Sequence, residues 1–283
     1  MTSFAGKLGL IAGGGSLPID LARHCAAAGR PLLVIRLKGF ADPALAAYDG
    51  VDVGIAQLGA GMRALRRAGC QSVCFAGVVP RPDFRDLKPD MRGLAALPAA
   101  IAAARRGDDG LLTFLVGEFE REGFAVEGAH EVMAGLTLNV GALGRHGPGP
   151  EHQGDIARAL EVARAIGALD IGQGAVCCDG LILALEAQEG TDMMLARVTD
   201  LPEAIRGTRA RRRGVLVKAC KPQQEARIDL PTIGPETVRR AAWAGLAGIA
   251  GEAGLILVLS PGEVISLADE LGLFVTGVAP PQP

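Results

Sequence analysis

The chain has 283 residues, of which 49% are hydrophobic, 21% charged and only 4% aromatic. This length allows two domains with a large buried core, and the composition is that of a globular protein rather than a disordered one. A formal net charge of −2 and few aromatic rings argue against a nucleic-acid-binding protein, which needs a basic surface and rings that stack on bases. Any anion site must therefore be local.

The cysteines and the N-terminus favour a cytoplasmic protein. None of the six cysteines forms a CxxC pair, so a zinc site is poorly supported. The chain does not begin with a basic region and an apolar signal core, which predicts the reducing cytoplasm. The most apolar window, residues 241–260, is interrupted by Glu252 and rich in glycine, so we interpret it as a buried helix and strand rather than a membrane span.

The first 140 residues alternate between short apolar runs and helical patterns. We expect strands at 8–12, 31–37, 72–78 and 124–126, and helices at 19–28, 56–68, 94–106 and 110–122. A β-turn-α-β order of this kind is typical of a doubly wound parallel sheet. The sequence therefore predicts a Rossmann-like N-terminal domain at residues 1–140.

A glycine-rich turn at residues 13–18 joins the first expected strand to the first helix. Backbone N–H groups at a helix N-terminus can hold a phosphate or a sugar. A dinucleotide fingerprint would need GxGxxG, but Pro18 stands at the third glycine. Two interpretations stay open, a nucleotide-binding turn and a tight turn without a ligand. The expected strand at 72–78 ends in a second polar turn with Gly77 and Arg81, at the edge where such sheets bind ligands.

The second half of the chain predicts a different fold. Residues 141–154 are rich in glycine and proline and predict a linker. The expected helices are 155–169, 235–250 and 261–271, and the expected strands are 174–178, 181–186, 215–220, 254–259 and 273–278. Asp179-Gly180 favours a two-residue hairpin turn between the first two of these strands. We therefore expect a C-terminal mixed α/β domain at residues 155–283.

Two segments of this second domain, 185–192 and 218–230, concentrate carboxylates, lysines and small polar residues. Phosphoryl chemistry needs such a mixture, because cations neutralise phosphate oxygens, carboxylates hold Mg²⁺ and one carboxylate can orient the attacking water. A helix cap at Asp192 and a surface ion-pair segment at 218–230 would explain the same residues without a site. A basic run at 206–213 suits a substrate pyrophosphate or an anionic membrane surface, or simply a solvated loop.

The segments 186–195, 221–224 and 227–234 resemble the UDP-2,3-diacylglucosamine pyrophosphatases of the LpxI type, as do 11–18, 77–82 and 245–254. The resemblance covers nearly the whole chain. It implies a Mg²⁺-dependent hydrolase of lipid A biosynthesis that cleaves UDP-2,3-diacylglucosamine to UMP and 2,3-diacylglucosamine 1-phosphate (lipid X), with water attacking the α-phosphorus. It also implies an active site in the cleft between two domains, a homodimer, and a peripheral place on the cytoplasmic face of the inner membrane.

The resemblance also suggests roles for individual residues. Glu225 would be a metal ligand or a water-orienting group, although the family pattern has aspartate at this position. The extra methylene displaces the carboxylate, and a misplacement of about 1 Å can cost roughly 10²-fold in rate, so we expect slow turnover. The other expected residues are Asp192 and Glu189 as a catalytic pair, with Asp192 also on the metal, and Thr191 and Lys218 on phosphate oxygens. Arg227 and Asp229 are expected to support the loop, and Arg227 also to bind the substrate. The remaining substrate-binding candidates are Gly13, Gly15, Ser16, Gly77 and Arg81.

Two other functions fit the residues. A lipid- or nucleotide-binding protein without activity would use the glycine turn to hold a sugar nucleotide. An NAD(P)-dependent oxidoreductase would use the first domain, but the missing third glycine argues against it.

Overall fold

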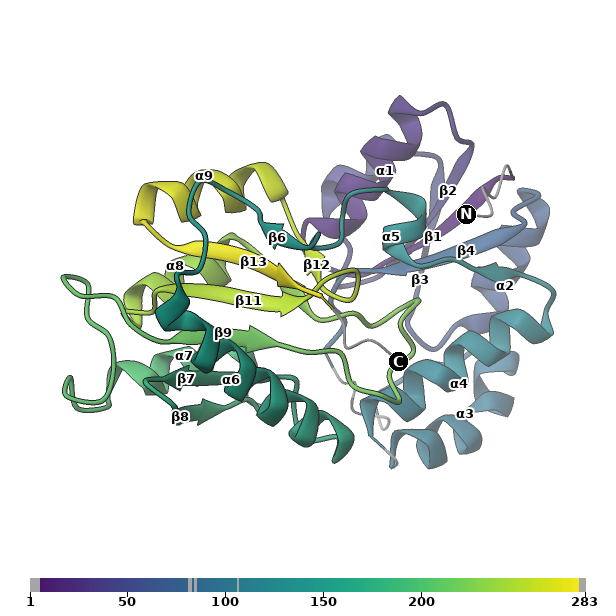
Figure 1. Ribbon diagram of the computed structural model, residues 1–283. Coiled ribbons are helices and arrows are strands. Elements are labelled where there is room, and N and C mark those ends of the chain that lie inside the picture. Colours follow the sequence, from purple (N-terminus) through teal and green to yellow (C-terminus); the bar gives the residue numbers. More distant parts are fainter. Residues whose placement is uncertain (1–5, 81–82, 84–85, 106, 280–283) are drawn as a thin grey trace. The chain divides into compact units, whose positions relative to one another are not determined.

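The computed structural model describes residues 6–80, 83, 86–105 and 107–279, and the chain divides into two compact units (Figure 1). The N-terminal unit contains the residues up to Ala134 and the separate segment Glu225–Asp229, and the C-terminal unit contains Gly135–Gln224 and the residues from Leu230 onward. The division after Ala134 falls a few residues before the boundary expected at 140. The separate segment was not expected from the sequence.

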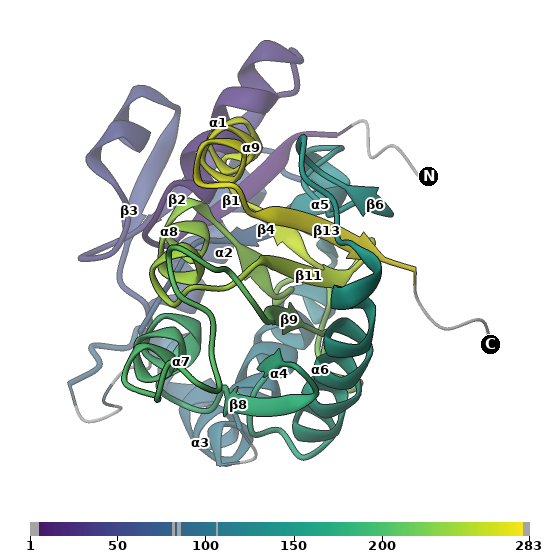
Figure 2. The same ribbon diagram turned by 60° about the vertical axis from the view of Figure 1, so that its left-hand side comes forward.

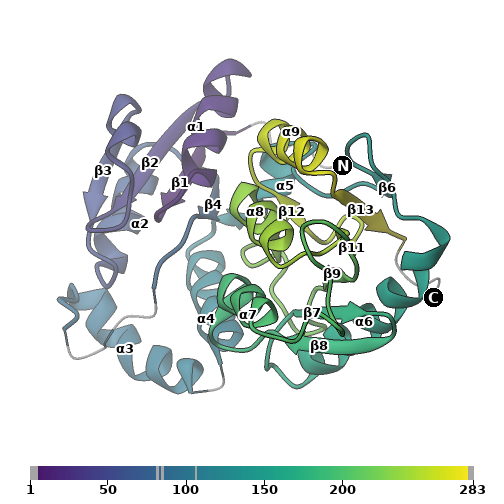
Figure 3. The same cartoon turned by 90° about the vertical axis from the view of Figure 1, so that its left-hand side faces the viewer.

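The N-terminal unit is built on a parallel sheet with the strand order β3-β2-β1-β4-β5. The first four of these strands are labelled in Figures 2 and 3. Its strands are β1 (Leu8–Ala12), β2 (Leu32–Leu37), β3 (Gly50–Val53), β4 (Ser72–Ala76) and β5 (Ala125–Val126). Its helices are α1 (Leu17–Ala27), the short 3₁₀ helix η1 (Pro43–Ala47), α2 (Leu58–Arg67), α3 (Met91–Ala104), α4 (Asp108–Arg121) and α5 (Ala129–Val132). The parallel sheet with helices that the sequence predicts is confirmed.

Strand β1 is buried along its whole length, as expected for a central parallel strand covered on both faces. Strand β3 was not expected, because this short edge strand leaves Val51 and Asp52 exposed and therefore lacks the apolar run that marks a buried strand. Helix α4 contributes Phe119 to the core, where its ring meets Phe75 edge-on at a centroid distance of 5.2 Å. The segment Glu225–Asp229 adds Ile228 to the same core.

The C-terminal unit has a mixed sheet with the strand order β13-β11-β9-β7-β8. Its strands are β7 (Gly174–Cys178), β8 (Leu181–Leu185), β9 (Val215–Lys218), β11 (Gly248–Glu252) and β13 (Phe274–Val278). Strands β9, β11 and β13 are parallel, and β7 runs antiparallel to both β9 and β8. The short strands β10 (Thr232–Ile233) and β12 (Leu257–Val258) pair separately, and β6 (Gly141–Ala142) lies in the segment expected as a linker.

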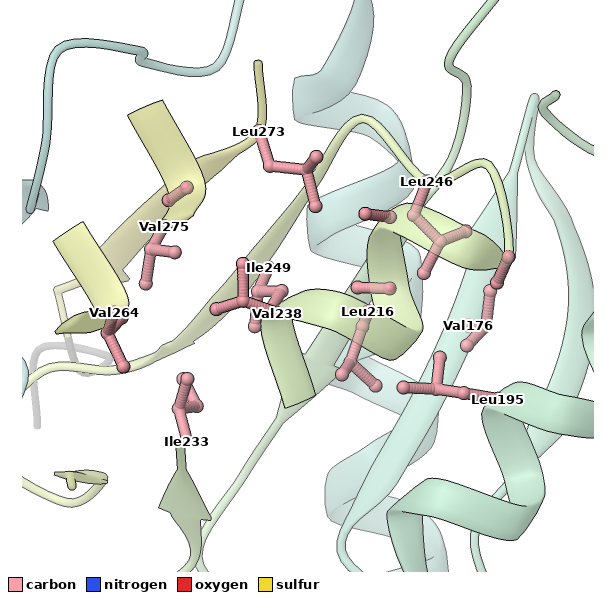
Figure 4. Packing of buried hydrophobic residues seen from close by; sticks show 14 of the residues in the cluster. Val176, Leu195, Leu216, Ile233, Val238, Leu246, Ile249, Val264, Leu273 and Val275 are labelled. Carbon is pink, nitrogen blue, oxygen red and sulfur yellow. The ribbon is translucent and has the colours of Figure 1, made fainter. Parts of the chain in front are cut away.

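Alternating residues of this sheet pack against helices on opposite faces (Figure 2). Helix α6 (Pro150–Ala168) covers one face, and α7 (Gly190–Thr199), α8 (Pro235–Trp243) and α9 (Pro261–Leu271) cover the other. Residues such as Leu216 and Ile249 face the second group of helices, and Val217 and Ala250 face α6. Figure 4 shows the resulting aliphatic packing. The scarcity of aromatic residues in the sequence is thus reflected in this core.

The hairpin expected at Asp179-Gly180 is confirmed, since β7 and β8 pair antiparallel and both turn residues have positive φ angles of 51° and 80°. Such angles are what a type I′ turn requires. Several expected elements have different bounds in the structure. Helix α6 begins at Pro150 rather than at residue 155, because proline is well suited to the first helical position.

In the part of the chain that the structure describes, no helix is both long and apolar enough to cross a bilayer.

The helix expected to reach residue 250 ends at Trp243, and residues 248–252 form β11 instead. Gly245 has a φ of 78°, a conformation that terminates helices. Gly248 lets β11 lie against β13, because a Cβ at this position would be 2.4 Å from the Phe274 ring. The apolar run therefore spans two elements, and hydrophobicity alone could not separate them.

We predict that Gly248→Ala lowers the free energy of unfolding by about 1–3 kcal/mol, because the new methyl group overpacks the contact with Phe274. Denaturant unfolding measures the change. The control is Gly154→Ala in α6, where no heavy atom lies within 4 Å of the new Cβ; it should be neutral or stabilise by up to about 1 kcal/mol. Equal stabilities of the two variants would contradict the close approach of β11 and β13.

Candidate functional site

Buried polar residues gather at one edge of the C-terminal sheet. Strands β8, β9 and β11 run in the same direction, so their carboxyl ends share this edge. Lys218 ends β9, Glu252 ends β11 and Glu186 follows β8, and each of these residues is no more than 5% exposed. Charged groups are rarely buried unless they are paired or functional. This edge is therefore the first candidate for a site.

A chain of hydrogen bonds links Lys218 to Glu186 through Thr191. The Lys218 Nζ lies 2.8 Å from the Thr191 hydroxyl and 3.1 Å from the backbone carbonyl of Thr232. The Thr191 hydroxyl in turn donates to Glu186 Oε1 at 2.9 Å. Among the residues that the structure describes, Glu186 Oε2 is buried without a hydrogen-bond partner. The structure thus brings together Thr191 and Lys218, the two residues expected on phosphate oxygens.

Sequence reasoning did not assign a role to Glu186. The sequence did contain a signal for this residue, because Glu186 directly follows the apolar strand β8. In the structure its side chain is buried, with 5% exposure. Strand ends in open α/β sheets carry functional groups. An acceptor oxygen buried without a partner costs free energy, so Glu186 joins the candidates for a functional role.

A second buried acid, Glu252, fixes the loop that follows β9. Its Oε1 accepts two hydrogen bonds from the Arg164 guanidinium at 2.9 and 2.6 Å, and its Oε2 accepts one from the Cys220 N–H at 2.9 Å. The next residue, Lys221, forms an ion pair with Asp170 at 2.8 Å. These contacts hold residues 220–224 on the C-terminal unit. They are structural contacts that keep the chain in place just before Glu225.

Glu225 itself lies in the N-terminal unit. The Arg227 guanidinium donates to both of its carboxylate oxygens, Nε to Oε1 and Nη2 to Oε2, each at 2.8 Å. The third guanidinium nitrogen of Arg227 lies 2.7 Å from Glu120 on α4. The backbone closes a turn here, because the Ile228 and Asp229 N–H groups both donate to the Glu225 carbonyl at 3.0 Å. Arg227 therefore contacts both Glu225 and Glu120, and Glu120 was not among the residues expected at the site.

The hydrogen bonds from Arg227 hold the pKa of Glu225 below its ordinary value. The carboxylate is therefore ionised at neutral pH, as a metal ligand must be. Because the pKa is lower in the folded state, the pairing of Glu225 with Arg227 contributes its full stabilisation above pH 4.5, the ordinary pKa of the carboxyl group. This stabilisation is lost as the pH falls through the lower pKa of the folded state. The same hydrogen bonds raise the pKa of Arg227, which stays charged throughout.

The other expected acids lie at the start of α7. Asp192 has a half-exposed side chain 3.6 Å from the Arg240 Nε. Glu189 is exposed, pairs with Arg197, and has its pKa lowered first by a backbone N–H and then by the Arg197 charge. Their neighbour Thr191 instead points into the buried chain. Glu189 and Asp192 belong to the C-terminal unit, whereas Glu225 belongs to the N-terminal unit.

The glycine turn of the N-terminal unit packs against the turn after β4. The Gly13 N–H donates to the Ala76 carbonyl at 2.8 Å, and Gly14 and Val78 exchange hydrogen bonds at 2.9 Å. A Cβ on Gly77, whose φ is 91°, would lie 2.5 Å from the Gly14 carbonyl. Gly13 and Gly77 are therefore explained by close backbone packing alone.

Two residues of the glycine turn remain open to solvent. Gly15 has a φ of 86° with open space around its Cα, and Ser16 precedes α1 without a side-chain cap hydrogen bond. Both are exposed, so a ligand could reach the N-terminus of α1 here. Arg81, which was also expected on the substrate, lies outside the described residues.

No metal cage is preformed among the residues described, since no three His, Cys, Asp or Glu side chains come together there. Mg²⁺, however, is usually held by one or two carboxylates, with substrate phosphates and water completing its coordination. A carboxylate has about four lone-pair positions, and Arg227 leaves part of this capacity on Glu225. The ionised oxygens of Glu225 therefore fit Mg²⁺ chemically.

We predict that Lys218→Met lowers the free energy of unfolding by about 1–3 kcal/mol, because Thr191 and Glu186 lose their cationic partner in a buried place. Adding Glu186→Gln to this variant removes the buried negative charge and should restore part of the lost free energy of unfolding. The expected interaction energy between the two substitutions is about 0.5–3 kcal/mol. Denaturant unfolding of the double-mutant cycle measures it. Arg158→Ala breaks the exposed pair with Glu161 and serves as the control, with an expected cost of about 0–1 kcal/mol. Strict additivity in the cycle would show that the buried chain is not coupled.

Comparisons with known proteins agree on one family. The model of the LpxI N-terminal domain matches residues 7–136, and that of the LpxI C-terminal domain matches residues 139–276. The UDP-2,3-diacylglucosamine pyrophosphatase LpxI of Caulobacter vibrioides is 64% identical over 274 residues, which cover 97% of this chain and 98% of that protein. Among solved structures, an alignment with the crystal structure of the Bordetella bronchiseptica enzyme WbmG in complex with NAD and UDP covers 96% of this chain and 99% of that one. The sequence identity is 13% and the TM-score is 0.30, so we draw no conclusion from this similarity. On the two domain matches and the 64% identical relative, the chain belongs to the LpxI family.

Proposed function

We propose that this chain is a hydrolase that cleaves the pyrophosphate bond of UDP-2,3-diacylglucosamine to UMP and 2,3-diacylglucosamine 1-phosphate, a step of lipid A biosynthesis. The observation that carries the proposal is the 64% identity, over nearly the whole of both chains, with a protein named for this activity. A homodimer and a peripheral place on the cytoplasmic face of the inner membrane are part of the same proposal.

The N-terminal unit would bind the nucleotide part of the substrate. Its parallel sheet has the strand order β3-β2-β1-β4-β5, and nucleotide-binding sheets of the Rossmann type place phosphates at the turn after the first strand. The exposed Gly15 and Ser16 lie at this turn. The N–H groups of a helix N-terminus favour a negative charge there. This supports a Rossmann-like assignment in which Ser16 approaches a substrate phosphate or sugar.

The C-terminal unit would act on the phosphates through its buried chain. Lys218 supplies a positive charge in a place with little water, where electrostatic stabilisation of a developing phosphate charge is strong. Thr191 and the Thr232 carbonyl fix the ammonium group, and Glu186 fixes Thr191. The proposal requires these residues and Glu225 to act on the same substrate molecule, although they belong to different units.

Glu225 would hold Mg²⁺, with Asp192 as the second proposed ligand. When bound, the metal neutralises phosphate charge and lowers the pKa of a coordinated water. Arg227 holds the Glu225 carboxylate by a bidentate contact, which fixes its direction as well as its charge. Water would attack the α-phosphorus, which places the new oxygen in UMP.

The two rival functions have less support. An NAD(P)-dependent oxidoreductase would need the third glycine that Pro18 replaces. A binding protein without activity would not require a buried lysine joined through Thr191 to an acid at the strand edge.

We expect UMP and lipid X to appear when the chain is incubated with UDP-2,3-diacylglucosamine and Mg²⁺, and not when a chelator is present. Hydrolysis in ¹⁸O-water should place the label in UMP. Retention of intact substrate with every divalent metal would favour a binding protein, and label in lipid X would refute attack on the α-phosphorus.

Glu225→Asp should raise the rate of UMP release, by up to roughly 10²-fold if the longer side chain misplaces the carboxylate by about 1 Å. Glu225→Ala should abolish the Mg²⁺-dependent rate and serves as the negative control. An aspartate variant no faster than the parent would show that the length of this side chain does not limit turnover.

Glu120→Gln should lower kcat about 2- to 10-fold with little change in KM, because Arg227 then loses one of the two carboxylates that hold its guanidinium. Steady-state kinetics of UMP release measure both constants. Glu161→Gln, which removes the comparable exposed pair with Arg158 in α6, is the matched control and should change neither. An equal effect of the two variants would assign Glu120 a role in surface charge only.

A further inference from the structure

A cavity of about 460 Å³ lies at the opposite end of the C-terminal sheet from Lys218 and Glu252. Its wall includes Gly214 and Phe274, at the amino ends of β9 and β13, and Asp179, which follows β7, the strand antiparallel to β9. All the residues that line it belong to the C-terminal unit. A cavity of this size can hold a small molecule. Of the residues described, none that is proposed to act on the substrate lines it.

The basic run at 206–213 supplies the cations of this cavity. Three of its arginines already have partners, which are backbone carbonyls, a carboxylate or an aromatic ring; these are Arg206, Arg213 and Arg209. The other two, Arg211 and Arg212, both line the cavity. No carboxylate among the described residues lies within ion-pair distance of either of them. The cavity therefore contains two positive charges that are not balanced by a direct contact.

Arg212 is the more confined of the two cations. It is partly buried, and its Nη1 donates to the carbonyls of Ala242 and Leu246 at 2.8 and 3.5 Å. Burial, followed by the charge of Arg209, lowers the pKa of Arg212, but a guanidinium group in a protein keeps its proton at neutral pH. A cation withdrawn from water costs free energy unless an anion balances it. Arg212 is thus the first indication of an anionic ligand.

His152 adds a hydrogen-bond donor to the same cavity. Its Nδ1 accepts from the Gly149 N–H at 3.1 Å, so the neutral ring carries its proton on Nε2. No residue in the described part of the chain accepts a hydrogen bond from this Nε2. The side chain is 17% exposed, and its ring packs on Phe274 at a centroid distance of 5.1 Å. Helix α6 and the loop before β9 thus both direct donors to one cavity.

The acids of the cavity wall are already engaged. Asp179 forms an ion pair with Arg213, and the buried Asp155 accepts from two backbone N–H groups and a thiol. Glu151 lies against the first turn of its own helix, α6, where a negative charge is favourable. The acids close in sequence that do not line the cavity are Glu203, Asp269 and Glu270. Arginines and acids are equally numerous in the wall, but the groups left without a partner are donors.

We propose that this cavity binds a phosphate group, either free or carried by a small molecule, through Arg211, Arg212 and His152. A phosphate has acceptor oxygens in several directions and suits donors from two elements, whereas a single planar guanidinium satisfies a carboxylate. The volume leaves room for an organic part beside the phosphate, against Phe274. The proposal does not rest on the proposed function, because the two sets of residues lie at opposite ends of β9.

Thermal unfolding and ³¹P NMR titration of the full chain test the proposal without any substrate. Glycerol 3-phosphate or inorganic phosphate should raise the midpoint of unfolding, because a ligand that binds only the folded chain stabilises it. Acetate at the same ionic strength should not. Tighter binding of glycerol 3-phosphate would identify a phosphorylated small molecule as the ligand, and equal binding would identify free phosphate. A chain that binds neither would refute the proposal.

Four variants test the residues. Arg212→Lys should weaken binding of glycerol 3-phosphate roughly tenfold, because lysine lacks the planar fork of donors. Arg211→Gln, at an exposed position that folding does not need, should weaken it by about two- to tenfold. Glu151→Gln should instead tighten it by about two- to fivefold, because a negative charge leaves the wall. Arg158→Gln makes the same charge change on an exposed part of α6 and should bind as the parent does.

Lys218→Met separates the cavity from the sheet edge of the proposed function. Binding of glycerol 3-phosphate should persist in this variant, measured at a temperature where it is folded. Binding lost in Lys218→Met but retained in Arg211→Gln and Arg212→Lys would place the ligand at the sheet edge and overturn the proposal. A parent chain whose phosphate binding depends on Arg212 but which releases no UMP would contradict the proposed function and leave the cavity site intact.

Discussion

A buried ammonium group determines the organisation of the C-terminal unit. Lys218 is 4% exposed, and a charge in such a place has to be hydrogen-bonded and balanced. Thr191 from the start of α7 and the Thr232 carbonyl provide the hydrogen bonds, and Glu186 provides the opposite charge through Thr191. The ends of β8 and β9, the start of α7 and strand β10 are therefore tied to a single cation.

The segment Glu225–Asp229 imposes a second constraint. Its neighbours in sequence are held on the C-terminal unit by Glu252 and Asp170, whereas its own residues pack in the N-terminal unit through Ile228 and the ion pair between Arg227 and Glu120. The chain thus crosses between units twice within a few residues. The Glu225 carboxylate is therefore held by the N-terminal unit, whereas Lys218 is held by the C-terminal unit.

The glycine turn and helix α3 show that a sequence pattern does not by itself reveal the physical reason for it. Gly13 and Gly77 are needed because two backbones approach closely, a requirement that exists without any ligand. The alanine-rich segment of α3 was expected as a helix, and it is one, but its pattern alone does not tell which face is covered. Only the packing of α3 against its neighbours shows that Met91 and Leu94 remain exposed.

Local signals in the sequence predicted the alternation of strands and helices in the first half and the hairpin at Asp179-Gly180, and the structure confirms both. These features depend on local periodicity and turn residues. The tertiary structure decided that Glu186 belongs to the buried chain, that Glu120 supports Arg227, and that α8 ends at Trp243 although the apolar pattern continues. The contact between Glu120 and Arg227 joins residues that are 107 positions apart in sequence, and no local pattern encodes such a contact.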